Sequence, residues 1–144
     1  MYQKILVALD ATAADESLLP HVRELAQKFN SELLLVHVAD GWAARHFGGI
    51  LQPAESEEMK TDRAYLETAA IPLRAVGLQV TTQLALGDPP REILRVAEKE
   101  NCDLIAMTTH GHRLLGDIIF GSTIEAVRHR AHIPLLLVRA ERLG

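Results

Sequence analysis

The sequence is poor in the features that mark secreted, membrane and nucleic-acid-binding proteins. Its 144 residues include a single cysteine, Cys102, so no disulfide can form within the chain. No stretch approaches 18 apolar residues, and the opening MYQKILVALD has no signal-peptide pattern. The net charge of −4 argues against the basic face of a duplex nucleic-acid binder. We therefore expect a cytoplasmic protein without membrane insertion and without a nucleic-acid partner.

The common catalytic and metal-binding signatures are also missing. A P-loop needs a lysine before its Ser or Thr, but Ser122 directly follows Gly121. Ser122 does not lie in the Gly-x-Ser-x-Gly setting of an esterase nucleophile. His110 and His112 have no evident third ligand nearby, whereas zinc sites use three or four. We expect no catalytic residue and no metal site.

What the sequence does contain is a regular alternation of short apolar runs and amphipathic segments. The runs predict strands over residues 4–9, 32–39, 78–86, 103–108 and 133–139. The spacing predicts helices over residues 15–29, 55–76, 89–100 and 122–129. Pro72 should kink or divide the second helix, and Gly77 should cap it. The alternation predicts one domain, a three-layer α/β/α sandwich with a five-stranded parallel sheet.

Ligands of such sheets bind beyond the carboxyl ends of the strands. Asp10 directly follows the first predicted strand, and Val38 lies at the tip of the second. His37, beside it, is expected to be a packed and hydrogen-bonded strand residue. The fourth strand runs into TTHGHRLLGDIIFGST, residues 108–123. The candidate ligand site is therefore the edge where these segments meet.

This glycine-rich segment has the character of an anion site. Gly111 allows a sharp turn and a close approach to a ligand. A helix beginning at Ser122, with Ser122 as its N-cap, would offer unpaired amides and a positive dipole end. His112 and Arg113 could add positive charge. On glycine count alone, a plain helix start after a loop remains an equal alternative.

The spacing of Gly111, nine residues, then Gly121-Ser122 resembles the glycine motif of the universal stress protein family. The runs KILVALD, LLLVHV, LGDPPREIL, DLIAMTTHG and IPLLLVR are also similar to that family, so the resemblance covers nearly the whole chain. It implies one universal stress protein domain over residues 1–144. The implied fold is Rossmann-like, of the adenine nucleotide alpha hydrolase-like type.

The resemblance further implies a site for ATP, AMP or another adenine nucleotide, with or without Mg²⁺. Asp10 would lie near the adenosine, and the backbone of Val38 would line the adenine pocket. Gly111, Gly121 and the residues after it would hold the ribose and phosphates. The full expected set is Ala8, Leu9, Asp10, Val38, Met107, Thr108, Gly111, His112, Arg113, Gly121, Ser122 and Thr123.

One position departs from the family motif, which has glycine where this chain has Thr108. A β-branched residue is strained at positive φ. If the site needed that conformation, nucleotide binding would be weakened or altered. Ala8 stands where many relatives have proline, and we expect little consequence.

Three functions are compatible with these residues. The first is a cytosolic, nucleotide-dependent stress-response regulator that hydrolyses ATP slowly at most and is therefore not an enzyme in the usual sense. The alternative is a dimeric interaction protein that binds no nucleotide. The third is a nucleotidyl- or phosphoryl-transferring enzyme. The resemblance implies a homodimer through residues 133–139, from Ile133 to Arg139. Residues 40–54 would form a lid over the nucleotide, form a surface for a protein partner, or simply cover the sheet edge.

Overall fold

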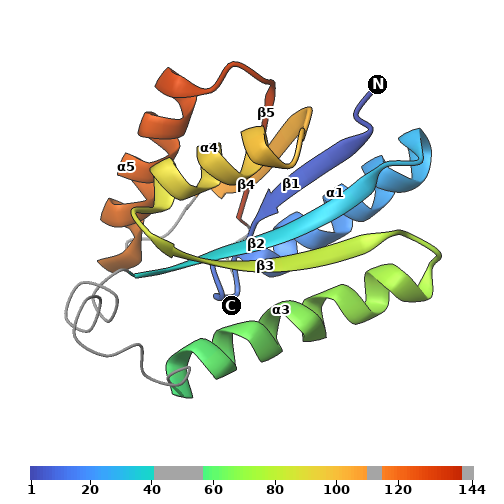
Figure 1. Cartoon of the computed structure of the whole chain (residues 1–144), viewed down its shortest axis with the longest axis horizontal. Helices are drawn as coiled ribbons and strands as arrows, with labels where there is room; N and C mark the ends of the chain where they lie inside the picture. Colours follow the sequence, from blue (N-terminus) through green and yellow to red (C-terminus); the bar gives the residue numbers. More distant parts are fainter. Residues whose placement is uncertain (41–56, 110–114, 141–144) are drawn as a thin grey trace.

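The chain forms a parallel sheet with helices on both faces (Figure 1). The structure is a computed structural model that describes residues 1–40, 57–109 and 115–140, with only the backbone described at residue 40 and residues 115–121. The strands are β1 (Lys4–Ala8), β2 (Glu32–Asp40), β3 (Val80–Gly87), β4 (Leu104–Thr109) and β5 (Leu135–Arg139). The helices are α1 (Asp15–Phe29), α3 (Glu57–Ala75), α4 (Pro89–Lys99) and α5 (Leu115–Arg130).

The strand order is β3-β2-β1-β4-β5, and every neighbouring pair runs parallel. Ile5 of β1 lies between Leu33 of β2 and Leu104 of β4. The chain builds outward from β1 to β3, then crosses back and builds outward through β4 and β5. The order therefore reverses between β1 and β4, which is the point where sheets of this kind bind ligands. The predicted α/β/α sandwich is confirmed.

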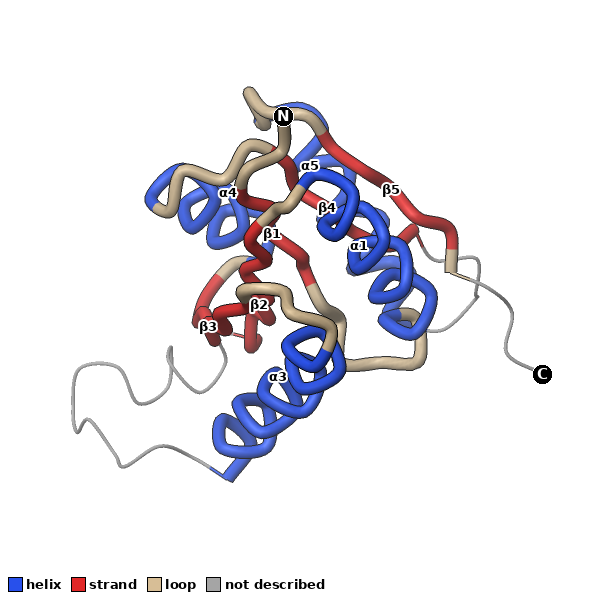
Figure 2. Tube along the Cα trace, turned by 90° about the vertical axis from the view of Figure 1, so that its right-hand side faces the viewer, coloured by secondary structure: helices blue, strands red, loops and turns tan. Residues whose placement is uncertain are grey.

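Two apolar cores lie on opposite faces of the sheet, because successive strand side chains point to opposite sides. Ile5 and Leu33 pack with α1 and α3 in one core. Leu6 and Leu34 pack with α4 and α5 in the other. Figure 2 shows α1 and α3 together on one side of the strands. With both faces covered, the strands are apolar throughout rather than alternating.

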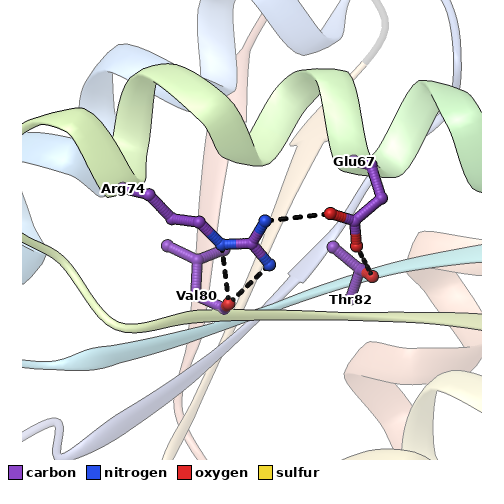
Figure 3. Close-up of polar contacts among 4 residues, drawn as sticks. All are labelled: Glu67, Arg74, Val80 and Thr82. Atoms are coloured by element: carbon purple, nitrogen blue, oxygen red, sulfur yellow. Dashed lines mark hydrogen bonds and ion pairs between the residues drawn. The ribbon is translucent and has the colours of Figure 1, made fainter.

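The outer edge of β3 is covered by polar side chains (Figure 3). Because the Gln79 carbonyl accepts from Leu33 of β2, the Val80 carbonyl points away from the sheet. Arg74 of α3 donates to that carbonyl from Nε at 3.2 Å and from Nη2 at 2.9 Å. Its Nη1 donates to Glu67 at 2.9 Å, and Glu67 accepts from the Thr82 hydroxyl at 2.6 Å. These contacts occupy an edge that could otherwise pair with another strand.

Helix α3 ends as predicted at Gly77 but is not interrupted by Pro72. Gly77 has φ +90°, its amide donates to the Arg74 carbonyl, and the Leu78 amide donates to the Leu73 carbonyl. This is a Schellman cap, which favours glycine in the left-handed position. The helix runs through Pro72 to Ala75, so Pro72 does not divide it, and the other outcome, a kink, stays a prediction. Packing of Leu73 against the sheet outweighs the lost hydrogen bond.

The predicted start of the last helix was also wrong. Helix α5 begins at Leu115, so Gly121 and Ser122 lie inside it and Ser122 is not the N-cap. Glycine costs only about 1 kcal/mol inside a helix. The apolar spacing of Leu115, Ile118 and Ile119 (i, i+3, i+4) favours the helical conformation. The unpaired amides of this helix therefore belong to the turn that starts at Leu115, not to Ser122 and Thr123.

Candidate functional site

A cavity of about 420 Å³ opens at the carboxyl ends of β1, β2 and β4, next to the reversal of strand order. That volume is within the range of about 300–1,000 Å³ typical of small-molecule sites. The described lining residues are Ala8, Leu9, Asp10, Val36, His37, Val38, Ala39, Glu58, Asp62, Pro89, Ile93, Met107 and Thr123. The cavity lies on the edge that the sequence predicted.

Six of the predicted site residues are among the described residues that line this cavity. They are Ala8, Leu9, Asp10, Val38, Met107 and Thr123. Although they come from β1 and the turn after it, from β2, from β4 and from α5, the parallel arrangement brings them to one edge. Thr123 reaches the cavity from the second half of α5, so the later part of this helix contributes even though its start was misplaced.

Two other predicted residues with described side chains, Thr108 and Ser122, are not part of the described lining. Thr108 is 2% exposed within β4, where it pairs with Val138. Ser122 is exposed on α5, and Gly121 lies inside that helix. Gly111, His112 and Arg113 lie outside the described residues.

Thr108 is not strained. In the described ranges, the non-glycine residues with positive φ are Tyr2, Ala11, Asn30 and Asn101. Thr108 has ordinary strand backbone, which suits its branched side chain. Its departure from the family motif therefore has no backbone cost.

Seven lining residues were not predicted from the sequence. They are Val36, His37, Ala39, Glu58, Asp62, Pro89 and Ile93. Pro89 opens α4 directly after β3, so its place beyond a strand end could have identified it. Glu58 and Asp62 are spaced i, i+4 on α3, a pattern that puts both on one helix face. Nothing in the sequence indicates that this face turns toward the cavity.

The turn between β1 and α1 is organised by a buried carboxylate. Asp15 is 1% exposed, and its Oδ1 accepts from the Asp10 amide and its Oδ2 from the Ala11 amide, both at 2.8 Å. Oδ2 also accepts from the Tyr65 hydroxyl of α3 at 2.5 Å. Ala11 adopts φ +62°, a conformation unusual for a non-glycine residue. Thr12 donates to Asp10 Oδ2 at 2.8 Å and so fixes the carboxylate that lines the cavity.

Burial perturbs both partners of the Tyr65–Asp15 hydrogen bond. Desolvation raises the pKa of Asp15, and the hydrogen bonds from Tyr65 and the Asp10 and Ala11 amides offset this only in part. Burial also raises the pKa of Tyr65, and its hydrogen bond to Asp15 adds to the rise. Tyr65 is therefore held as a neutral donor.

His37 is packed and hydrogen-bonded, as predicted, and it also faces the cavity. Its Nδ1 lies 2.9 Å from the Leu9 carbonyl oxygen, which can only accept, so Nδ1 donates the proton. Its Nε2 lies 3.9 Å from Oδ2 of Asp62 on α3. The imidazole therefore joins the tip of β1 to the wall formed by α3.

The polar part of the described lining is acidic. It includes the carboxyl groups of Asp10, Glu58 and Asp62, but no lysine or arginine. Val36, Val38, Ile93 and Met107 provide an apolar wall. This combination suits a flat, uncharged group with hydrogen-bond donors better than a phosphate.

No cluster of three or more His, Cys, Asp or Glu side chains in the described ranges has the arrangement of a metal site. None of the described helices combines the length and apolarity needed to cross a membrane.

Known proteins resemble this chain over nearly its whole length. The model of the Universal stress protein family matches residues 1–139. The universal stress protein MJ0531 of Methanocaldococcus jannaschii is 30% identical, over 96% of this chain and 83% of its own. The solved structure of MJ0577, from the same organism, has a TM-score of 0.83 at 29% identity and covers 99% of both chains. The universal stress protein from Archaeoglobus fulgidus in complex with dAMP has a TM-score of 0.71 at 21% identity, over 95% of this chain and 98% of its own.

Proposed function

Because this chain belongs to the universal stress protein family, we propose that it binds an adenine nucleotide, ATP or AMP, and acts as a nucleotide-dependent stress-response regulator. The observation that carries the proposal is the cavity at the strand-order reversal, which is lined by Asp10, Val38 and Met107. A related protein of the same fold from Archaeoglobus fulgidus is known in complex with dAMP.

The cavity suits the nucleoside part of the ligand. A purine ring would lie against the apolar wall formed by Val36, Ile93 and Met107. The Val36 carbonyl accepts from the Leu9 amide, so the amide and carbonyl of Val38, two residues further, point the same way beyond the end of β1. These backbone groups offer one donor and one acceptor to the edge of a base. The Asp10 carboxylate would accept from a ribose hydroxyl.

The phosphates would leave the cavity toward the segment that follows β4. The carboxylates of the described lining repel anions. Gly111, His112 and Arg113, the predicted phosphate-binding residues, follow β4 in sequence, and the first turn of α5 comes directly after them. Mg²⁺ would accompany a triphosphate there. The protein would bind nucleotide and hydrolyse it slowly at most.

A second proposal concerns assembly. Strand β5 is the outer strand of the described sheet opposite β3, and Leu137 on it is 39% exposed. We propose that residues 133–139 pair with a second copy of the chain. The alternative function, a dimeric interaction protein that binds no nucleotide, uses this same edge. Light scattering at micromolar concentration tests the dimer, and a monomer would contradict both the dimer and the alternative function.

Calorimetric titration with ATP, AMP and adenosine, each with and without Mg²⁺, tests the function. We expect micromolar binding of AMP, weakened about tenfold or more by Asp10→Asn. Asp103→Asn is the matched control, because Asp103 accepts from the Gln3 and Lys4 amides at the opposite end of β1. A folded protein that gives no heat with any of the three ligands would refute nucleotide binding and leave the interaction protein. A turnover assay with labelled ATP separates the regulator from an enzyme.

A further inference from the structure

The β1–α1 turn and helix α3, two walls of the cavity, are joined by one hydrogen bond. Tyr65 of α3 donates to Asp15, which is 1% exposed and also accepts the amides of Asp10 and Ala11. Asp10 lies in the cavity lining, whereas Tyr65 and Asp15 do not. The pair therefore acts one step behind the surface that a ligand would touch.

The turn that Asp15 holds is not a conformation that the chain adopts without support. Ala11 has φ +62°, a left-handed conformation in which the Cβ of a non-glycine residue crowds the backbone. Both amides that bond to the carboxylate belong to the bend. A carboxylate that loses its third partner, the Tyr65 hydroxyl, has a less defined position from which to hold them. The direction in which the Asp10 side chain leaves the backbone depends on this bend.

Helix α3 presents one face to this region. Glu58, Asp62 and Tyr65 are spaced i, i+4 and i+7, so they lie along one stripe of the helix. Glu58 and Asp62 line the cavity. Tyr65, one turn after Asp62, reaches the turn that carries Asp10. The Tyr65–Asp15 bond therefore links the α3 stripe that carries Glu58 and Asp62 to the turn that carries Asp10.

We propose that Tyr65 and Asp15 are positioning residues for ligand binding: they hold Asp10 and the α3 wall in the geometry that accepts the ligand. The proposal rests on the proposed function, because it needs a nucleotide in this cavity. Neither residue touches the nucleotide. Each acts through the backbone that it fixes.

The experiment compares Tyr65→Phe with Tyr2→Phe in the full chain. Tyr65→Phe removes one hydroxyl and leaves the ring, which packs against the core. Tyr2→Phe is the matched control, because Tyr2 packs edge-on to Phe29, away from the cavity lining. Titration with AMP measures affinity. Amide hydrogen exchange at Asp10 and Ala11 reports on the turn in the free protein.

In Tyr65→Phe we expect AMP to bind about fivefold to tenfold more weakly and the Asp10 and Ala11 amides to exchange faster. Tyr2→Phe should change neither. If Tyr65→Phe lowers stability but binds AMP as tightly as the unmodified protein, its role is structural and the inference is wrong. If the unmodified protein gives no heat with AMP, ATP or adenosine, the proposed function fails and takes the inference with it. The two failures are therefore distinguishable.

Discussion

His37 donates from Nδ1 to the carbonyl oxygen of Leu9 at 2.9 Å, across the gap between β2 and the end of β1. This contact selects the tautomer of the neutral ring. With the proton on Nδ1, Nε2 is left as an acceptor on the side of Asp62. While the ring is neutral, the cavity therefore has an acceptor at Nε2 beside the Asp62 carboxylate, rather than a second donor.

The tautomer can be measured directly. Long-range ¹H–¹⁵N correlation spectra at a pH where His37 is neutral should show the proton on Nδ1. His37→Asn keeps a donor at the Nδ1 position and removes Nε2, so it should fold normally but bind the nucleotide differently. His37→Leu should also lower the free energy of unfolding by about 1 kcal/mol, because the Leu9 carbonyl loses a donor. A proton found on Nε2 would contradict this geometry.

The raised pKa of Tyr65 predicts its behaviour in alkali. The folded state favours the protonated phenol of Tyr65. Its contribution to the free energy of unfolding is therefore fully present below pH 10.0, the ordinary pKa of a tyrosine, and is lost as the pH rises above that value. The sequence has two tyrosines, so Tyr2→Phe leaves Tyr65 as the sole reporter. Its phenolate absorption should appear only when the protein unfolds. Ionisation near pH 10.0 with the fold intact would refute the burial and the bond to Asp15.

The cap at Gly77 should be sensitive to any side chain. A Cβ at Gly77 would meet no atom within 4 Å, so a side chain would cause no steric clash with neighbouring residues. The loss of stability would come from the backbone, because φ is +90°. Gly77→Ala should lower the free energy of unfolding by about 1 kcal/mol. Val76→Ala, at the neighbouring and 45% exposed position, is the control and should cost less. Equal losses in denaturant melts would mean that the backbone at Gly77 is not left-handed.

Arg74 should contribute more to stability and to the protection of the β3 edge than an ordinary surface arginine does. It is 42% exposed, so its ion pair with Glu67 is screened, but its two bonds to the Val80 carbonyl cover the edge of β3. Arg74→Ala should lower the free energy of unfolding by about 1 kcal/mol and increase self-association at high concentration.

Arg95→Ala is the matched control for that variant, because Arg95 pairs with Glu92 on its own helix. Arg95→Ala should lower the free energy of unfolding by about 0.5 kcal/mol or less and leave self-association at high concentration unchanged. If Arg95→Ala and Arg74→Ala associate equally, the edge of β3 does not depend on Arg74.

The parts of the structure that local sequence determines were predictable. Strand runs such as KILVA are apolar because both sheet faces are covered, and Gly77 indicates a cap because the αL position favours glycine. The start of α5 was not predictable in this way, because glycines that suggest a loop are tolerated inside a helix at modest cost.

The site residues also fall into two groups, those that local sequence predicts and those that depend on the packing of α3. Asp10 follows the end of β1 and Val38 lies near the end of β2, so the topology rule finds them without any knowledge of packing. Asp62 and the Tyr65–Asp15 bond depend on where α3 lies over the sheet, and Asp15 and Tyr65 are 50 positions apart. No local pattern encodes that placement.

Thr108 tests whether the departure from the family glycine limits binding. Its backbone has an ordinary strand conformation, so a glycine there would not relieve any strain. Its side chain is 2% exposed, so a glycine would lose the packing of that side chain. Thr108→Gly should lower the free energy of unfolding by about 1–2 kcal/mol and leave AMP affinity within about twofold. Ala106→Gly, on the same strand and fully buried, is the control for the effect of glycine in β4. If Thr108→Gly tightens AMP binding tenfold while Ala106→Gly does not, the threonine restricts the site, and backbone strain is not the reason.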